Sequence, residues 1–399
     1  MVVVKRILLT GATGGLGRMI LPRLIEEGHI ITCIARPKGK ISAYERIAEI
    51  VPNMNNILVL EGDVRKPTCG VHIDTHALGR FFPDAILHAA ADIRFDQSCA
   101  AEIYDTNCNG TANMLALATQ LGVREVQHVS TVYVGGDADE FTEYDVDIGQ
   151  TLRNPYEDSK LKGEILVRDW ALKSRSSRRA RMLRSSILIG CENGETTSFD
   201  AFYGYFARFH AIARSMRDRI NAGGESPTGV TVLPDGTVDI PLVVVASPTS
   251  TLNMIPLNWY ADTLVKLVSV PLAPRPERFH LVNHEPPRVR WVIETSLRAL
   301  KISGVRIVET LEEQSRLISE LPPLLRKLQK RVDAVLGQYL PYVTQEPRFA
   351  SRKPQRLLGV RYRDPPLIDE AYLERLLDFA VKTNWGHATL KTSQELELA

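Results

Sequence analysis

The chain has 399 residues, of which 44% are hydrophobic and 24% are charged, and its formal net charge is +2. This balance is typical of a folded globular protein with a large core, and it excludes a disordered or collagen-like chain. The small net charge gives no general reason to expect a nucleic-acid partner. No apolar run approaches the roughly 20 residues that a membrane-spanning helix requires.

The cysteines are scattered and form neither a CxxC pair nor a cysteine-histidine cluster. They are Cys33, Cys69, Cys99, Cys108 and Cys191. An odd number without metal-ligand spacing predicts reduced thiols, no metal site and a cytoplasmic setting.

The first half of the sequence alternates short apolar runs with amphipathic segments. Buried strands are predicted over residues 2–10, 30–35, 57–60, 85–88 and 126–129, and helices over 16–27, 43–50 and 99–121. Continuous apolar strands separated by helices favour a parallel sheet that is covered on both faces. The expected fold is therefore α/β, with a doubly wound parallel sheet of the Rossmann type.

The second half begins with the same alternation and then becomes less regular. A helix is predicted over 154–173 and a strand over 182–189. Later helices are predicted over 198–219, 289–300, 311–336 (broken at Pro322 and Pro323) and 368–382, before a frayed end at 389–399.

These patterns predict two domains. A nucleotide-binding domain is expected over residues 1–190, with 250–284 returning to it. A smaller, mostly helical substrate domain is expected over 191–249 and 285–399.

A glycine-rich turn, TGATGGLG at residues 10–17, follows the first predicted strand and opens a helix. Gly11 permits a tight turn, Gly14 lets the backbone approach a pyrophosphate, and Gly17 lets helix and strand pack closely. The helix N-terminus offers N–H groups and a positive dipole end to phosphates. The turn therefore predicts a dinucleotide site.

Arg36 ends the second predicted strand, where an enzyme that prefers NAD usually carries an acidic residue. An arginine there can bind the additional phosphate of NADP, so NADPH is predicted over NADH. The alternative is a solvated surface arginine.

In the segment GDV, Asp63 can accept a hydrogen bond from the adenine amino group, and the small residues after His88 let the backbone pass close to the cofactor. His88 itself is interpreted as a packed structural histidine.

The predicted cofactor residues share these turns and strand ends. They are Gly11, Thr13, Gly14, Gly15, Leu16, Gly17, Arg36, Asp63, Val64, Ala89, Ala90, Ala91 and Lys160.

Tyr156 and Lys160 lie four residues apart at the start of a predicted helix, on one helical face. A nearby ammonium favours the phenolate and makes a tyrosine a better acid or base, and Lys160 can also bind the nicotinamide ribose. Thr131 follows the fifth strand, at the sheet edge where ligands of α/β folds bind, so its hydroxyl can hold a substrate carbonyl beside Tyr156. Ser130 is the alternative if the register differs by one.

Asn107 lies in the middle of a predicted helix, where asparagine is unfavourable. It is therefore predicted to have a specific role, such as holding a water for proton relay. The alternative is that Asn107 faces solvent.

The motifs TGATGGLG, GDV, HAAA, NCNGT, VSTVY and YEDSK occur in this order across residues 4–190, and the chain resembles an extended short-chain dehydrogenase/reductase. Matched position by position, the resemblance assigns catalytic roles to Thr131, Tyr156, Lys160 and Asn107. The segments IARP at 34–37, LEGDVRKP at 60–67 and MIPLNWYAD at 254–262 resemble the thioester reductase and fatty acyl-CoA reductase branch. The chain departs from that branch in lacking a proline after Arg184 and in carrying Asn258 where an aspartate is usual.

That branch implies hydride transfer from NADPH to an acyl thioester on coenzyme A or a carrier protein, giving an aldehyde or alcohol. The alternatives are a nucleotide-sugar epimerase or dehydratase, a reductase of a free ketone or aldehyde, and a non-catalytic nucleotide-binding protein. The sequence leaves open peripheral membrane contact and a choice between monomer and homodimer.

Two basic segments are further candidates for partner contacts. An arginine cluster comprises Arg175, Arg178, Arg179, Arg181 and Arg184, and the segment 199–219 interleaves aromatic residues with arginines. They are hypothesised to line an acyl tunnel and to receive a phosphopantetheine arm, a carrier protein or an anionic membrane. A solvated loop and a packed helix with a charged outer face are the favoured alternatives.

Overall fold

The computed structural model describes residues 4–71, 78–174, 177–224, 226 and 229–386. The chain divides into two compact units. Unit 1 comprises Met1–Leu188, Ile255–His284 and Pro347–Pro365, and unit 2 comprises Ile189–Met254, Glu285–Glu346 and Pro366–Ala399. Of the predicted features, residues 2 and 3 of the first strand, Arg175 and the frayed end at 389–399 lie outside the described residues.

Unit 1 is built on a seven-stranded sheet with the order β13-β7-β5-β4-β1-β2-β3, in which every neighbouring pair is parallel. Its strands are β1 Arg6–Thr10, β2 Ile30–Ala35, β3 Ile57–Glu61, β4 Ala85–His88, β5 Glu125–Thr131, β7 Arg179–Ser185 and β13 Glu277–Leu281. The strand order reverses between β1 and β4, so a crevice for a ligand is expected at the carboxyl ends of these two strands. The predicted doubly wound Rossmann sheet is confirmed.

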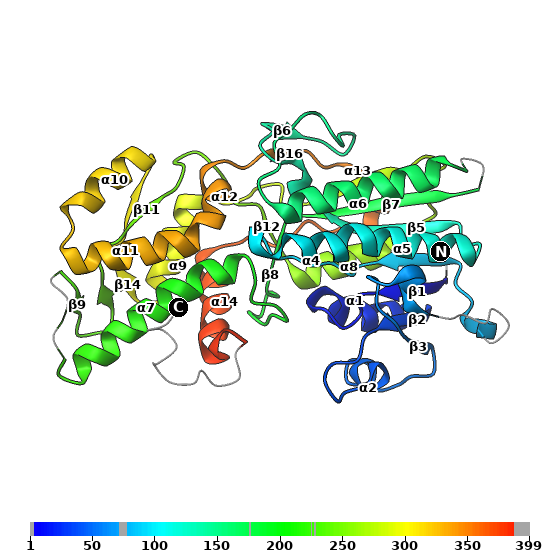
Figure 1. Cartoon of the computed structure of the whole chain (residues 1–399), viewed down its shortest axis with the longest axis horizontal. Coiled ribbons are helices and arrows are strands. Elements are labelled where there is room, and N and C mark those ends of the chain that lie inside the picture. The colour runs from blue at the N-terminus through cyan, green and yellow to red at the C-terminus, as the bar shows by residue number, and fades with distance from the viewer. Residues whose placement is uncertain (1–3, 72–77, 175–176, 225, 227–228, 387–399) are drawn as a thin grey trace. The chain divides into compact units, whose positions relative to one another are not determined.

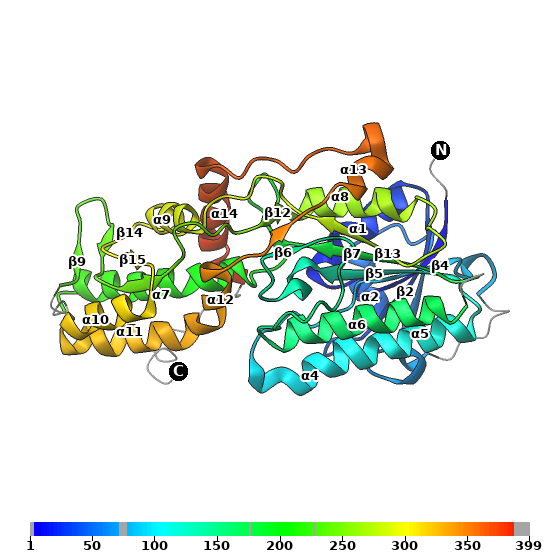
Figure 2. The same ribbon diagram turned by 90° about the horizontal axis from the view of Figure 1, so that it is seen from above.

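Helices cover both faces of this sheet (Figure 1, Figure 2). They are α1 Gly15–Glu26, α2 Ala43–Ala48, α4 Ala100–Tyr104, α5 Gly110–Gln120, α6 Pro155–Leu172, α8 Leu257–Val268 and α13 Lys353–Leu358. Side chains alternate along each strand, so Ile7 and Leu9 face the cluster that α1 and α8 cover, whereas Leu8 faces the cluster under α5 and α6. Figure 2 shows α5 and α6 side by side on one face and α8 on the other.

The segment Pro347–Pro365 belongs to unit 1, although the sequence pattern placed it in the substrate domain. Ser351 Oγ donates a hydrogen bond to the His280 carbonyl at 2.5 Å, and Lys353 Nζ donates to the Arg278 carbonyl at 3.3 Å. The short strand β16 Arg348–Phe349 also pairs with β6 Glu140–Phe141. These long-range contacts attach the segment to β13, and no local pattern signals them.

Unit 2 consists of helices and short strands. Its helices are α7 Phe202–Asn221, α9 Val289–Ala299, α10 Leu311–Glu320, α11 Pro323–Leu336, α12 Leu340–Thr344 and α14 Glu370–Lys382. Its strands are β9 Thr231–Val232, β10 Val238–Asp239, β11 Val243–Val245, β14 Ile302–Ser303 and β15 Arg306–Val308. The strands β8 Ile187–Ile189 and β12 Met254–Pro256 pair where the chain passes from one unit to the other. The break predicted near Pro322 and Pro323 separates α10 from α11.

Candidate active site

The glycine turn between β1 and α1 has the geometry that a dinucleotide pyrophosphate requires. A Cβ on Gly11 would lie 2.6 Å from backbone atoms of Ala89 and Ala90, and a Cβ on Gly17 would lie 2.1 Å from the Gly11 carbonyl oxygen. Gly14 is exposed, and a Cβ there would meet only the Gly11 carbonyl oxygen, at 3.4 Å. The first turn of α1 has neither a side-chain cap nor an acidic residue, so its positive dipole end is available to an anion. These residues fit the phosphates of NAD(P).

The small residues after β4 are held against this turn by Thr10. The Ala89 N–H donates to the Thr10 carbonyl at 3.2 Å, and the Ala90 N–H donates to Thr10 Oγ1 at 3.3 Å. His88 lies beneath, with its ring nitrogens 2.7 Å from Thr10 Oγ1 and 3.1 Å from Thr111 Oγ1. Burial lowers the pKa of His88 to about 3, so the ring is neutral and packed as a structural histidine.

Asp63, at the end of β3, binds arginines. Arg65 donates to both carboxylate oxygens, with Nη2 2.7 Å from Oδ2, and Arg36 Nη1 lies 3.6 Å from Oδ2. Burial raises the pKa of the Asp63 carboxyl, but the arginines outweigh this effect and bring the pKa to about 2. The carboxylate is therefore charged, and the predicted bond to an adenine amino group would share it with Arg65. The carbonyl of the next residue, Val64, accepts from Asn113 Nδ2 at 2.8 Å, so this segment is fixed on α5.

Two further arginines, which the sequence reading did not single out, gather around Arg36. Arg46 of α2 donates from Nη1 to the Arg36 carbonyl at 2.6 Å, and Arg18 projects from α1. Burial lowers the pKa of Arg46, and the neighbouring charges of Arg18 and Arg36 lower it further. Three like charges beside a predicted ribose site favour an anionic ligand. The contact arises because α1, α2 and the end of β2 pack together.

Thr131 and Tyr156 approach one another at the carboxyl end of β5, closely enough for the threonine hydroxyl to affect the pKa of the phenol. Thr131 Oγ1 donates to the Ser185 carbonyl at 3.2 Å and accepts from the Tyr133 N–H at 3.2 Å, so its rotamer is fixed from two directions. The sequence predicted that Lys160 would lower the pKa of Tyr156, but burial raises this pKa, and the Thr131 hydroxyl only partly opposes the rise. The phenol is therefore protonated at neutral pH.

Lys160 lies one turn further along α6 and is buried. Its Nζ donates to the Val129 carbonyl at 2.6 Å. Burial lowers its pKa to about 8, and the carboxylate of Glu164 opposes that shift. At neutral pH the ammonium is still mostly charged, within reach of the same end of β5 that carries Thr131. Ser130 points elsewhere, because successive side chains of a strand lie on opposite faces of the sheet.

Asn107 lies in a π-helical turn, Asp105–Asn109, between α4 and α5. Its Oδ1 accepts from the Asp92 N–H at 2.8 Å, and its Nδ2 donates to the Asp92 carbonyl and to Ser159 Oγ, both at 2.9 Å. The side chain is buried, which excludes the solvent-facing alternative. Both hydrogens of the Asn107 side-chain amide therefore donate to protein acceptors. The role of this residue in holding a water stays a prediction. π-Turns within helices occur often at functional sites.

Two aromatic residues that the motifs did not indicate lie beside Tyr156. The rings of Phe95 and Tyr156 are 5.7 Å apart. Tyr260 of α8 is fully buried, and its hydroxyl donates to the Leu183 carbonyl at 3.3 Å. The two phenols are close enough for Tyr156 to raise the pKa of Tyr260. These neighbours pack around Tyr156, which is half-buried. Their approach depends on the packing of α8 and of the loop after β4.

The arginine cluster predicted as a partner surface has a different role. Arg181 and Arg184 of β7 are fully buried, and each is paired with a glutamate: Arg181 Nη2 lies 2.6 Å from Glu277 Oε1, and Arg184 Nη2 lies 2.7 Å from Glu164 Oε2. For these two residues the surface interpretation is wrong, because a β-strand in mid-sheet carries both of them into the interior.

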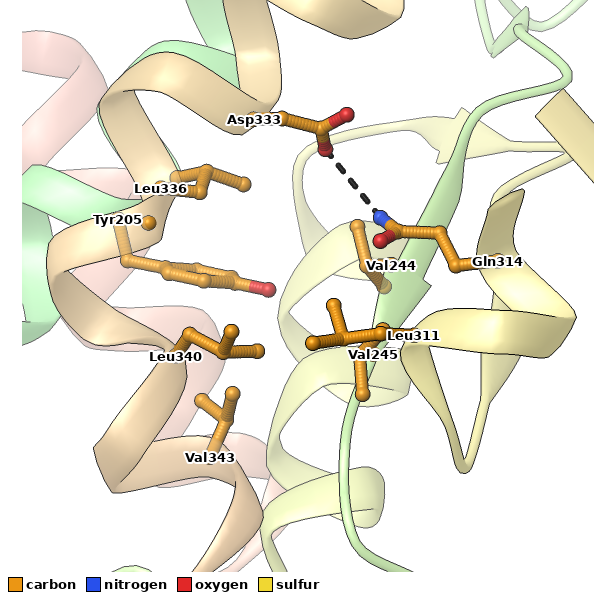
Figure 3. A pocket seen from close by; sticks show the side chains of 10 residues that line it. Tyr205, Val244, Val245, Leu311, Gln314, Asp333, Leu336, Leu340 and Val343 are labelled. Carbon is orange, nitrogen blue, oxygen red and sulfur yellow. Dashed lines mark hydrogen bonds between the residues drawn. The ribbon is translucent and has the colours of Figure 1, made fainter.

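The aromatic helix predicted over 198–219 is α7, and its aromatic side chains are mostly packed in the core of unit 2. Tyr205 also lines a small apolar cavity of about 150 Å³ (Figure 3). Figure 3 shows the phenol of Tyr205 pointing between Leu336 and Leu340 toward Val244. The other side chains that line this cavity are Val245, Leu311, Gln314, Asp333 and Val343.

Within the described part of the chain, no helix is long and apolar enough to cross a bilayer. The same residues contain no group of three histidine, cysteine or acidic side chains placed to hold a metal ion.

Comparison with known proteins identifies relatives for parts of this chain. Fatty acyl-CoA reductase wat of Drosophila melanogaster is 30% identical over 146 residues, which are 32% of this chain and 28% of the relative. Nonribosomal peptide synthetase asaC of Aspergillus flavus is 28% identical over 161 residues, which are 36% of this chain and 16% of the relative. The chain thus matches much less than two thirds of the length of either relative.

Among solved structures, the terminal R domain from the myxalamid PKS-NRPS pathway has a TM-score of 0.71 at 21% identity, with 96% of this chain and 92% of that chain covered. UDP-galactose 4-epimerase has a TM-score of 0.58 at 15% identity, with 95% and 100% covered. At these identities the likeness shows a shared fold.

The fold and the ordered motifs define an extended short-chain dehydrogenase/reductase, a class of NAD(P)-dependent oxidoreductases and epimerases. Residues 9–231, more than half of the chain, match the NAD-binding family described as Male sterility protein. The chain belongs to this family, and within it to the branch that resembles thioester reductases and fatty acyl-CoA reductases.

Proposed function

We propose that this chain catalyses the NADPH-dependent reduction of an acyl thioester, carried on coenzyme A or on a carrier protein, to an aldehyde or alcohol. The observation that carries the proposal is the approach of the Tyr156 phenol to Thr131 at the ligand-binding edge of the sheet, with Lys160 one turn along the same helix as Tyr156. The relatives named fatty acyl-CoA reductase and nonribosomal peptide synthetase support the substrate class.

The chain's own residues supply the proton and the oxyanion contacts. Thr131 and Tyr156 hold the thioester carbonyl oxygen by hydrogen bonds that strengthen as negative charge develops on it. The protonated phenol of Tyr156 then gives its proton to that oxygen. Lys160, charged at neutral pH, stabilises the phenolate that is left. Reduced nicotinamide, when bound, would supply the hydride. The hemithioacetal formed from hydride and proton then breaks its C–S bond, releasing the thiol of coenzyme A or of the carrier protein and leaving the aldehyde. Reduction to the alcohol consumes a second hydride and proton.

The preference for NADPH rests on the cluster of Arg18, Arg36 and Arg46. Arginine guanidinium groups form strong bidentate bonds with phosphate, and the mutual repulsion of three such groups is relieved by an anion. The 2′-phosphate of NADP is the anion that the end of β2 would receive in this fold. Asp63 and Glu49 already pair with Arg36 and Arg18. Glu49 also acts on Arg46 and opposes the lowering of its pKa, but burial and the two neighbouring arginines outweigh this effect.

A second candidate function is nucleotide-sugar epimerisation. N-acetyl-alpha-D-glucosaminyl-diphospho-ditrans,octacis-undecaprenol 4-epimerase of Escherichia coli O157:H7 is 29% identical over 191 residues, 47% of this chain and 50% of the relative. An epimerase retains its nicotinamide through the catalytic cycle, whereas a reductase consumes it.

The deciding experiment follows NADPH absorbance with the purified chain and a panel of acyl-CoAs, carrier-bound acyl groups, ketones and aldehydes. We expect stoichiometric oxidation of NADPH with thioesters. Tightly bound NAD in the purified chain, together with inertness toward every thioester, would favour the epimerase; oxidation with free carbonyls alone would restrict the activity to them.

A further inference from the structure

A buried ion pair lies behind the candidate active site, between α6 and β7. Glu164 and Arg184 both have 0% of their side-chain surface exposed. Arg184 Nε donates to Glu164 Oε1 at 2.8 Å, and Nη2 donates to Oε2 at 2.7 Å. Such a pair adds little net stability, because the cost of removing both charges from water offsets their attraction. We therefore expect the Glu164–Arg184 ion pair to have a role other than stabilising the fold.

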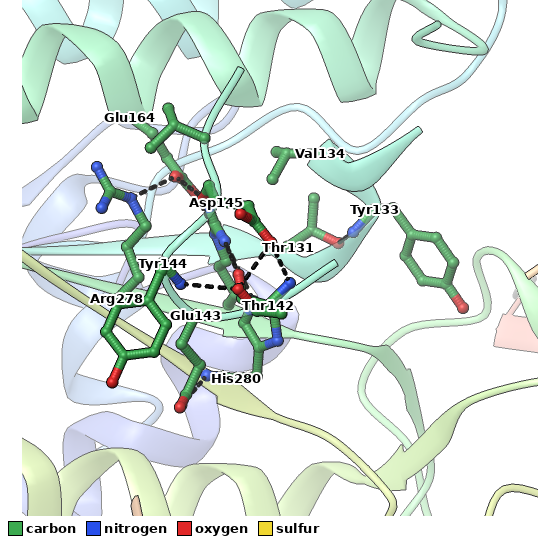
Figure 4. Close-up of polar contacts among 12 residues, drawn as sticks. Thr131, Tyr133, Val134, Thr142, Glu143, Tyr144, Asp145, Glu164, Arg278 and His280 are labelled. Carbon is green, nitrogen blue, oxygen red and sulfur yellow. Dashed lines mark hydrogen bonds and ion pairs between the residues drawn. The ribbon is translucent and has the colours of Figure 1, made fainter. Parts of the chain in front are cut away.

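The pair is held rigidly from several elements. Arg184 also donates to the Asp145 carbonyl at 2.9 Å and to the Thr142 carbonyl at 3.4 Å, and its Nη1 lies 3.1 Å from His280 Nε2. Figure 4 shows Arg278 approaching Glu164 from β13, with Nε 3.7 Å from Oε2. The carboxylate of Glu164 is thus fixed in place by two guanidinium groups.

Glu164 also contacts the active-site elements. It lies one turn beyond Lys160 on α6, so the two side chains share a helical face. Its partner Arg184 lies beside Ser130 in the parallel pairing of β7 with β5. Ser130 immediately precedes Thr131, which approaches the Tyr156 phenol. The ion pair therefore joins α6, which carries Tyr156, Lys160 and Glu164, to β7 beside the end of β5.

We propose that Glu164, clamped by Arg184 and Arg278, is a positioning residue that holds the end of β5 and keeps the Lys160 ammonium charged beside Tyr156. The catalytic part of this inference rests on the proposed function; the electrostatic part concerns the folded chain itself.

The charged and titratable groups around Lys160 support this assignment. His88 and His128 face it from β4 and β5, and burial lowers the pKa of both rings, so they are neutral. Cys108 faces it from the π-turn, and burial raises the pKa of that thiol to about 11, so it is also neutral. Glu164 is left as the anion that opposes the burial of Lys160.

The groups around Glu164 keep it ionised. Burial alone would raise the pKa of its carboxyl, but Arg184, Ser130 and Arg278 together lower it. Beyond Arg278 lie the charges of Arg168 and Asp145. Replacing Glu164 by glutamine therefore removes a permanent negative charge from the neighbourhood of Lys160.

The test measures the titration of Lys160 by NMR of 13Cε-labelled lysine, with the resonance identified from its absence in Lys160→Arg. We expect a midpoint near pH 8 in the wild type. In Glu164→Gln it should fall by about one pH unit, since loss of a nearby opposite charge disfavours the ammonium. Glu164→Asp, which keeps the charge, should restore most of the shift, and Glu143→Gln, which removes another buried carboxylate of unit 1, should leave the midpoint unchanged.

Glu164→Gln leaves Arg184 buried without its partner and can unfold the chain. The double variant Glu164→Gln/Arg184→Met removes both charges of the pair. Its midpoint should lie between those of Glu164→Gln and the wild type, because loss of the nearby cation partly compensates for loss of the carboxylate. A midpoint unchanged in the folded variants would overturn the inference.

The second readout is the pH profile of kcat/KM with NADPH and an acyl thioester, whose alkaline limb should move down with the NMR midpoint in Glu164→Gln. A uniform loss of rate at every pH, with no movement of the limb, would contradict the positioning role. If the wild type is inactive on thioesters, the proposed function fails, and the NMR arm still decides the electrostatic role of Glu164.

Discussion

Lys160 Nζ donates a 2.6 Å hydrogen bond to the Val129 carbonyl, two residues before Thr131 on the same strand. This bond joins α6 to the end of β5. The two elements that carry the tyrosine and the threonine are therefore connected directly by a hydrogen bond within the protein. Preorganised donors of this kind avoid a reorganisation cost when charge develops on a substrate.

Replacing Tyr156 by phenylalanine should reduce turnover by roughly 10²- to 10⁴-fold, the usual contribution of a positioned proton donor. The affinity for NADPH should be unchanged, because the glycine turn and the arginines do not contact this phenol. Fluorescence titration of NADPH and steady-state rates give the two quantities. Tyr44→Phe, at a tyrosine that is 57% exposed, is the matched control. Full turnover in Tyr156→Phe would exclude the phenol as the proton donor.

The pH dependence of kcat/KM should report Lys160. Its pKa is lowered to about 8, so the ammonium is present below that pH and is lost as the pH rises through it. The rate should be level between about pH 6 and 7 and should fall above pH 8. The Tyr156 phenol titrates above its ordinary range because burial raises its pKa, so it does not cause this limb. A rate that stays constant up to pH 10 would contradict the role of Lys160.

Cofactor choice should depend on the three arginines. Arg36→Ala or Arg46→Ala should raise the KM for NADPH by about 10- to 100-fold, the loss of one charge-assisted hydrogen bond of roughly 1.5–3 kcal/mol. The KM for NADH should change little. Arg290→Ala, which removes an exposed arginine of unit 2, should affect neither cofactor. Equal losses with both cofactors would show that the cluster does not bind the 2′-phosphate.

Alanine substitutions at Gly14 and at Gly17 should have different effects, although both residues lie in the glycine turn. In Gly17→Ala the new methyl group would lie 2.1 Å from the Gly11 carbonyl oxygen, so backbone must move, at a cost of about 1–3 kcal/mol or more. The variant should unfold at a lower temperature. Gly14→Ala, with its nearest atom at 3.4 Å, should keep the wild-type Tm while its affinity for the dinucleotide falls. Calorimetry and cofactor titration separate the effects; an unchanged Tm in Gly17→Ala would refute the packing role.

The features that the sequence predicted well depend on residues close together in the chain. The turn of Gly11 to Gly17 and the start of α6 at Asn154 are determined by local backbone chemistry, and Tyr156 and Lys160 share a face because of helical geometry. The parallel sheet follows from apolar runs separated by helices. The mid-helix position of Asn107 suggested a specific role, which stays a prediction; the structure places this residue in a π-turn.

The sequence did not predict contacts between segments that lie far apart in the chain. Arg18 and Arg46 join Arg36 only when α1 and α2 pack beside β2, and Tyr260 reaches Tyr156 only when α8 covers the sheet. The arginine cluster looked like a surface for partners, yet β7 takes Arg181 and Arg184 into the core.

The sequence by itself therefore determined the class of fold, the phosphate turn and the tyrosine-lysine pair, because spacing along a strand or helix dictates which neighbouring side chains share a face. Only the tertiary structure decided that three arginines converge, that Tyr260 approaches Tyr156, and that Glu164 is clamped by Arg184. These contacts depend on burial and on charge compensation between segments that are far apart in the sequence. The spacing of residues along the chain does not indicate which distant segments will meet.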